Sequence, residues 1–163
     1  MTATYEKIAT NTLSSATTTI TFSSIPATYT DLVLVVAGTF TNSGSSGLLR
    51  FNGDTASNYS STALRGNGTT ASSSRSTNKE YIAGNEDGSS LGQLNYIWNI
   101  INYANTTTYK TVLVRTNDAG AFVSTSSGSW RSTSAINSVT FFTGDPGISS
   151  GTTLNLYGIL KEA

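Results

Sequence analysis

The chain lacks several residue types on which common protein chemistry depends. Its 163 residues include no cysteine and no histidine, and only 11% are charged, against about 25% in typical soluble domains. Without cysteine there are no thiolate zinc sites, iron–sulfur clusters or disulfides. Without histidine there is no Ser-His-Asp triad, no Cys–His dyad and no histidine-ligated metal. These absences argue against most enzyme classes.

Net charge and long apolar runs are missing as well. Nine Lys and Arg residues balance nine Asp and Glu residues, and the basic residues are scattered singly, so no basic surface for nucleic acid is predicted. The longest strictly apolar run, residues 32–37, is far shorter than the roughly 20 residues that cross a bilayer. The first residues show no basic region followed by an apolar stretch, and we therefore expect no secretory signal.

What the chain does contain is typical of β-structure. Threonine, serine, asparagine and glycine make up 82 of the 163 residues, and threonine suits the solvated face of a strand. Apolar residues mostly alternate with polar ones, which is the pattern of half-buried strands. Strands of this length and spacing favour an all-β, single-domain antiparallel sandwich over residues 1–163. About eleven strands are predicted, at residues 5–13, 18–23, 31–37, 48–52, 60–66, 79–83, 94–102, 110–116, 122–125, 138–143 and 153–160.

Two segments need comment. Residues 91–103 place apolar side chains at helical spacing, but Gly92, three asparagines and four β-formers favour a strand, in which positions 94, 96, 98 and 100 alternate. Residues 67–78 are poor in apolar residues and low in complexity, and we predict a loop there. Turn formers such as Asn52-Gly53 separate the strands.

The acidic residues do not form a recognisable catalytic pair. A glycosidase needs two carboxylates across a cleft, whereas four of the five aspartates lie beside Gly or Asn in predicted turns, where Asp bonds its own backbone. The turn at residues 85–88 has two acids but lacks the ligand spacing of a dedicated calcium loop. We predict no catalytic, cofactor or metal residues. The four turn aspartates are Asp54, Asp87, Asp118 and Asp145.

Two neighbouring residues are candidates for contact with a partner. Trp130 and Arg131 lie in a polar stretch, and Trp and Arg are enriched at interfaces. The ring of Trp130 could also stack on a sugar. An equally good interpretation places Trp130 at an edge of the core, whereas Trp98, amid apolar residues, is predicted to be core.

Five motifs stand out along the chain: Tyr-Glu-Lys-Ile-Ala-Thr at 5–10, Ser-Ser-Ile-Pro-Ala-Thr-Tyr-Thr-Asp-Leu at 23–32, Arg-Phe-Asn-Gly-Asp-Thr-Ala-Ser-Asn-Tyr-Ser at 50–60, Leu-Arg-Gly-Asn-Gly at 64–68 and Gly-Thr-Thr-Leu-Asn-Leu-Tyr-Gly-Ile at 151–159. Together they resemble modules of tailed-phage virion proteins, especially those of cyanophage-like viruses. The resemblance covers nearly the whole chain and implies a jelly-roll-like β-sandwich with a structural role. It also implies that Arg50 and Asp54 pair around the Asn52–Gly53 turn and that Tyr157 closes the core.

The resemblance implies the function of a virion protein, assembled in the host cytoplasm, and the composition adds the expectation that it is not an enzyme. Because the strand pattern leaves no shaft or coiled coil, a capsid decoration (cement) protein is favoured. Expected partners are further copies in a homotrimer and major capsid or tail proteins, with no nucleic acid, membrane or cofactor. The alternative is a tail-fibre or receptor-binding module that recognises host surface glycans.

Overall fold

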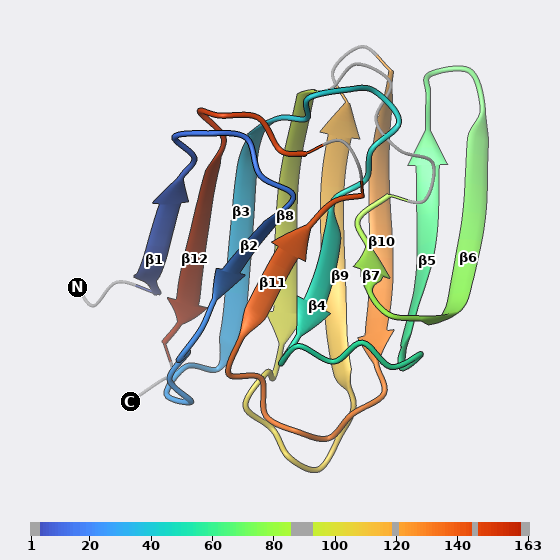
Figure 1. Cartoon of the computed structure of the whole chain (residues 1–163). Coiled ribbons are helices and arrows are strands. Elements are labelled where there is room, and N and C mark those ends of the chain that lie inside the picture. Colours follow the sequence, from blue (N-terminus) through green and yellow to red (C-terminus); the bar gives the residue numbers. More distant parts are fainter. Residues whose placement is uncertain (1–3, 86–92, 119–120, 145–146, 161–163) are drawn as a thin grey trace.

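A computed structural model describes residues 4–85, 93–118, 121–144 and 147–160 of the chain (Figure 1). These residues form twelve strands and no helix. None of them belongs to a helix long and apolar enough to cross a membrane. The strands are β1 (Tyr5–Thr12), β2 (Thr19–Phe22), β3 (Asp31–Thr39), β4 (Leu48–Phe51), β5 (Tyr59–Gly66), β6 (Ala71–Lys79), β7 (Ile82–Ala83), β8 (Gln93–Ile101), β9 (Lys110–Asp118), β10 (Phe122–Trp130), β11 (Val139–Phe142) and β12 (Thr153–Ile159).

The strands form two antiparallel sheets that pack as a β-sandwich. The large sheet has the order β1-β12-β3-β8-β9-β10-β5-β6, and the small sheet has the order β2-β11-β4-β7. Without β5, β6, β9 and β10, the remaining strands form the two four-stranded sheets of a jelly roll. The hairpins β5–β6 and β9–β10 therefore extend one sheet of a jelly roll by four strands. The predicted all-β, jelly-roll-like sandwich is confirmed.

The core lies between the sheets and follows the alternation of side chains along each strand. Leu156, Leu34, Trp98 and Val114 occupy one register row across β12, β3, β8 and β9, and all four are fully buried. From the small sheet, Phe141 meets Trp98 edge to face, with ring centroids 6.3 Å apart. Each such side chain contributes about 1.5–3 kcal/mol on burial. The predictions of a strand near residues 94–102 and of Trp98 in the core are confirmed.

The strand β6 was not predicted from the sequence. Residues 67–78 were expected to form a loop, but β6 is a strand of nine residues that pairs with β5. Most of its side chains are exposed on both faces, so it shows no apolar alternation. The strand predicted at residues 79–83 is divided in the structure, because Lys79 ends β6 whereas Ile82 pairs with β4 in the small sheet.

The large sheet is wider than the small one. Figure 1 shows β1 at one side and β6 at the other, both beyond the area that the small sheet covers. Tyr157 of β12 lies in register with Val33 and Lys7, between the buried residues Leu156 and Gly158. Its side chain therefore points to the outer face, away from the small sheet, and the implied role of Tyr157 in closing the core is wrong.

Candidate functional site

The connection between β4 and β5 begins with the predicted turn. Asp54 N–H donates a hydrogen bond to Phe51 O at 2.9 Å. The two central residues both have positive φ, 52° for Asn52 and 66° for Gly53. Two consecutive left-handed residues define a type I′ turn, for which Asn-Gly is a preferred pair. The turn directs the Asp54 side chain toward the end of β10.

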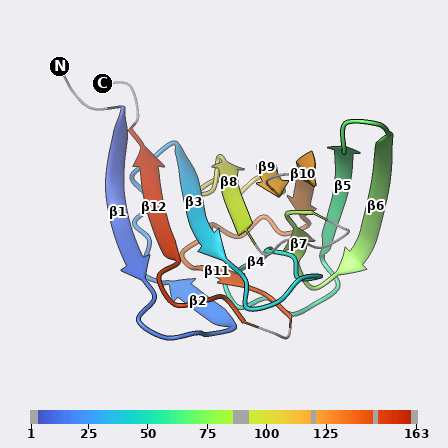
Figure 2. The ribbon, with the colours of Figure 1, turned by 90° about the horizontal axis from the view of Figure 1, so that it is seen from above.

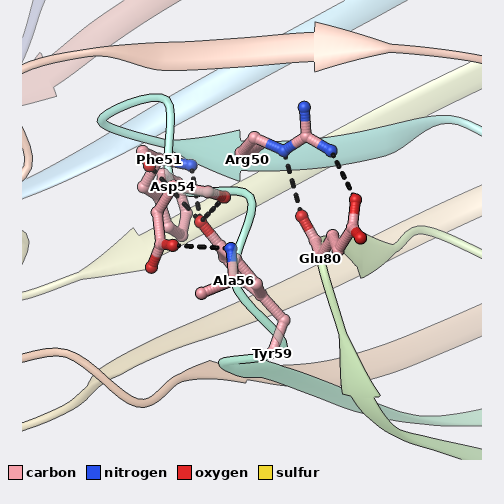
Figure 3. A network of polar contacts seen from close by, with 6 residues as sticks. All are labelled: Arg50, Phe51, Asp54, Ala56, Tyr59 and Glu80. Carbon is pink, nitrogen blue, oxygen red and sulfur yellow. Dashed lines mark hydrogen bonds and ion pairs between the residues drawn. The ribbon is translucent and has the colours of Figure 1, made fainter.

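Asp54 is the centre of a polar network (Figure 3). Its Oδ1 accepts a hydrogen bond from Ala56 N–H at 2.9 Å, and its Oδ2 accepts from Asn58 Nδ2 at 3.0 Å and Trp130 Nε1 at 2.7 Å. Burial alone would raise the pKa of Asp54. The hydrogen bonds from Asn58, Trp130 and Ala56, helped by the charge of Arg50, outweigh burial and lower this pKa below its ordinary value. The carboxylate is therefore ionised at neutral pH.

Three aromatic rings pack beside this carboxylate. The ring of Tyr59 stacks on that of Trp130, with centroids 6.1 Å apart and planes 15° apart, and Phe51 lies 5.6 Å from Trp130. The Tyr59 hydroxyl accepts a hydrogen bond from Phe51 N–H at 3.2 Å and lies 3.2 Å from Asp54 O. Burial raises the pKa of Tyr59 to about 12, so this hydroxyl stays protonated. We call Phe51, Asp54, Tyr59 and Trp130 the Asp54 clasp.

Arg50 does not pair with Asp54, and the implied ion pair is wrong. Its Nη2 lies 3.7 Å from Glu80 Oε2, and its Nε donates to Glu80 O at 3.0 Å (Figure 3). The guanidinium also lies 4.6 Å from the centre of the Phe142 ring. Phe51 points into the core from β4, so the adjacent Arg50 points to the opposite face. Its charge reaches Asp54 only at longer range.

Arg131 and Asn52 tie the neighbouring loops to the clasp. Arg131 Nη2 donates to Ser57 O at 2.7 Å and to Asn78 Oδ1 at 3.1 Å. Asn52 Nδ2 donates to Ala135 O at 2.8 Å. The residues that the sequence singled out thus converge on one end of the sandwich, and their polar groups bind the chain itself.

The sequence left two placements of Trp130 open, and the structure shows the core placement. The side chain is 2% exposed, and its indole N–H is bonded to Asp54. The ring therefore cannot serve as a surface contact for a glycan or a partner, and this hypothesis is corrected. The Asp54 clasp is a structural feature that joins β4, β5 and β10.

The surface feature that sequence reasoning missed lies on the outer face of the large sheet. A hollow of about 670 Å³ spans β8, β9, β10, β5 and β6, and Leu64, Ile97, Arg115 and Val123 are among the residues that line it. We call it the outer hollow. The run Val112–Val114, which puts apolar residues on both faces of β9, could have indicated that this face is not wholly polar.

Metal ligation finds no support in the described part of the chain. No three His, Cys, Asp or Glu side chains gather there closely enough to hold an ion. Asp118 ends β9 and its carbonyl accepts a hydrogen bond from Ala121 N–H at 2.9 Å. The turn at 85–88 was considered above as a calcium loop, and of its residues only Asn85 belongs to the described part of the chain. Asp87 and Asp145 therefore lie outside the described residues.

Comparisons with known proteins add no assignment. No family model and no curated protein matches the chain. Among solved structures, the chain shows similarity to a protein of unknown function from Shewanella oneidensis MR-1, with 12% sequence identity and a TM-score of 0.21. That match covers 99% of this chain and 79% of the other. At this TM-score the similarity supports no argument about fold or function.

Proposed function

We propose that this chain is a non-enzymatic structural protein of a tailed-phage virion, and specifically a capsid decoration protein. In this function it binds across neighbouring coat subunits as a homotrimer, and the buried contact area stiffens the shell. Interfaces of this kind bury on the order of 1,600 Å² each. The protein works by the fit of preformed surfaces and needs no cofactor.

The observation that carries the proposal is a jelly-roll sandwich with an extended sheet whose outer face exposes aliphatic side chains. Jelly rolls are common in viral capsid and lectin domains. Because a fold does not by itself assign a function, the sequence resemblance to virion modules and the exposed aliphatic face are both needed. On the outer face, Leu64 is 59% exposed and Val123 64% exposed, and apolar surface of this kind marks contact sites.

The side chains of the Asp54 clasp support the same function. They form a rigid unit in which the aromatic rings are buried and the polar groups are paired within the chain. Such a unit stabilises the end of the sandwich, and its own buried rings are not available to stack on a sugar. A decoration protein needs this rigidity, because it must keep its shape on a shell under internal pressure. The tail-fibre alternative would use Trp130 as a glycan contact, and this ring is buried.

The thermal stability of particles tests the proposal. Phage particles assembled without this chain are heated with and without the purified protein, and release of DNA is followed with a fluorescent dye. We expect the particles without the chain to release DNA at a lower temperature, and the added protein to restore the higher one. An unrelated protein of similar size serves as the control. Equal release temperatures with and without the chain would contradict a decoration function, and a loss of host adsorption alone would favour the tail-fibre alternative.

A further inference from the structure

The outer hollow combines a largely apolar lining with the exposed guanidinium of Arg115. Ile97, Arg115 and Leu64 lie in one register row with Thr125, across β8, β9, β10 and β5. Val123 lies two residues before Thr125 in β10, so its side chain is on the same face of the sheet. The row therefore places a guanidinium between aliphatic side chains on an open sheet face.

The exposure of these side chains is unusual for the outside of a sandwich. Leu64 and Val123 are more than half exposed, and Leu113, next to Arg115 on the same face of β9, is 45% exposed. Polar residues are expected at such positions when a sheet face only meets water. A cluster of aliphatic side chains that also lines a hollow marks a surface that another molecule covers.

Arg115 determines what that molecule must carry. Within the described part of the chain, no hydrogen bond, ion pair or ring contact involves its exposed guanidinium. Covering an arginine without an acceptor costs several kcal/mol, whereas a carboxylate can bind it through two parallel hydrogen bonds. A molecule that buries the aliphatic side chains therefore has to bring an acidic group to Arg115.

A second copy with the same face does not supply this group. Asp118 is the only acidic residue in the sequences of β8, β9, β10, β5 and β6, and it is buried. A symmetric contact through the hollow would bring Arg115 close to its own copy, and like charges at an interface are unfavourable. A sugar is also a poor fit, because the described residues that line the hollow include no aromatic side chain and sugars stack on aromatic rings.

We infer that the outer hollow binds a segment of the major coat protein that presents an apolar side chain beside a carboxylate. The apolar side chain packs against Leu64, Ile97 and Val123, and the carboxylate pairs with Arg115. This inference rests on the proposed decoration function and adds the surface through which the chain is attached. It also implies that the small sheet, on the opposite side of the sandwich, faces away from the shell (Figure 2).

Charge reversal with a matched control tests the inference. The purified wild type, Arg115→Glu and Arg75→Glu are titrated onto phage particles assembled without the chain, and the bound fraction gives the dissociation constant. Arg75 is an exposed arginine on the same face, in register with Thr62 and outside the hollow. We expect Arg115→Glu to weaken binding at least thirtyfold, as for loss of a buried charge pair, and Arg75→Glu to change it less than threefold. Both positions are exposed, and thermal unfolding checks that both variants fold.

A cross-link identifies the occupant. A photoreactive phenylalanine analogue replaces Val123 in the hollow or, as the control, the exposed Thr21 on the outer face of the small sheet. A cross-link from position 123 to a coat-protein peptide that contains Asp or Glu would support the inference. A cross-link from position 21 alone, a cross-link from position 123 to another copy of this chain, or unchanged binding of Arg115→Glu would overturn it while the decoration function stands. If the wild type does not bind the particles, both proposals fail.

Discussion

At the residue scale, one carboxylate joins three strands. β4 belongs to the small sheet, whereas β5 and β10 belong to the large sheet and are far apart in sequence. Asp54 follows β4, precedes β5 and accepts a hydrogen bond from Trp130 at the end of β10. Hydrogen bonds to a charged acceptor are about twice as strong as neutral ones. The half-buried position of Asp54 limits competition from water, so its three hydrogen bonds should stabilise the fold measurably.

Replacing this carboxylate by an amide should destabilise the protein. In Asp54→Asn the side chain keeps its size but loses the charge and one acceptor, and we expect a loss of about 2 kcal/mol in the free energy of unfolding. Urea denaturation at pH 7 measures it. Glu80→Gln, which removes only the exposed ion pair with Arg50, should cost less than about 1 kcal/mol. Equal effects of the two substitutions would show that the clasp adds nothing beyond surface charge.

The lowered pKa of Asp54 predicts how this difference varies with pH. A carboxyl whose pKa is lower in the folded than in the unfolded chain adds stability that is fully present above its unfolded pKa, near 3.9. That stability is lost as the pH falls through the folded pKa. The gap between wild type and Asp54→Asn should therefore be constant from pH 7 to about pH 5 and shrink below pH 4. A gap that does not change with pH would contradict the ionised clasp.

Side-chain placement was the part of the site that sequence could predict least. The Asn52–Gly53 turn was predictable because its backbone conformation favours those two residues. The environment of Trp130 was not, because its sequence neighbours are polar while its spatial neighbours, Phe51 and Tyr59, come from β4 and β5. The partner of Arg50 depends on the face of β4 from which it points, and Glu80 lies thirty residues away in the chain.

At the element scale, the short strand β7 is held tightly against β10. A Cβ atom added to Gly128 of β10 would lie 2.4 Å from Ile82 Cγ2, and Figure 1 shows β7 in front of β10. Gly128→Ala should therefore push β7 away and cost about 1–3 kcal/mol of stability. Gly66→Ala is the control, since nothing lies within 4 Å of its added Cβ. Thermal unfolding of both variants measures the difference, and a Gly128→Ala protein as stable as wild type would contradict the packing of β7.

The edge strand β6 gives a second test at this scale. Along β6, the backbone N–H groups point alternately toward β5, where they are hydrogen-bonded, and toward solvent. Hydrogen exchange followed by NMR should show slow exchange at alternate amides from Ala71 to Lys79. Uniformly fast exchange along the segment would mean that it is the loop that the sequence predicted.

Strand prediction succeeded where burial left its pattern in the sequence. β2, β9 and β12 have one buried face, and their alternation is visible in the residues. β6 has none, because it overhangs the small sheet and is stabilised by its ladder with β5. A serine-rich strand of this kind cannot be distinguished from a loop without knowledge of its neighbour.

At the scale of the whole molecule, the large sheet ends in two uncovered edge strands. β1 and β6 each pair on one side only, and such edges are available for contacts between copies. The proposed homotrimer requires a head-to-tail contact of β6 with β1 of the next copy, with a three-fold rotation that closes the ring. We therefore expect sedimentation equilibrium to give three times the 17.1 kDa of one chain. A monomer at micromolar concentration would contradict the proposed trimer.

The copy number of this chain in purified virions tests the proposed function most directly. Quantitative mass spectrometry with labelled peptides gives its ratio to the major coat protein. A decoration protein occupies symmetric positions over the whole shell, so the proposal predicts hundreds of copies per particle. A few tens of copies or fewer would contradict it and would place the protein in the tail.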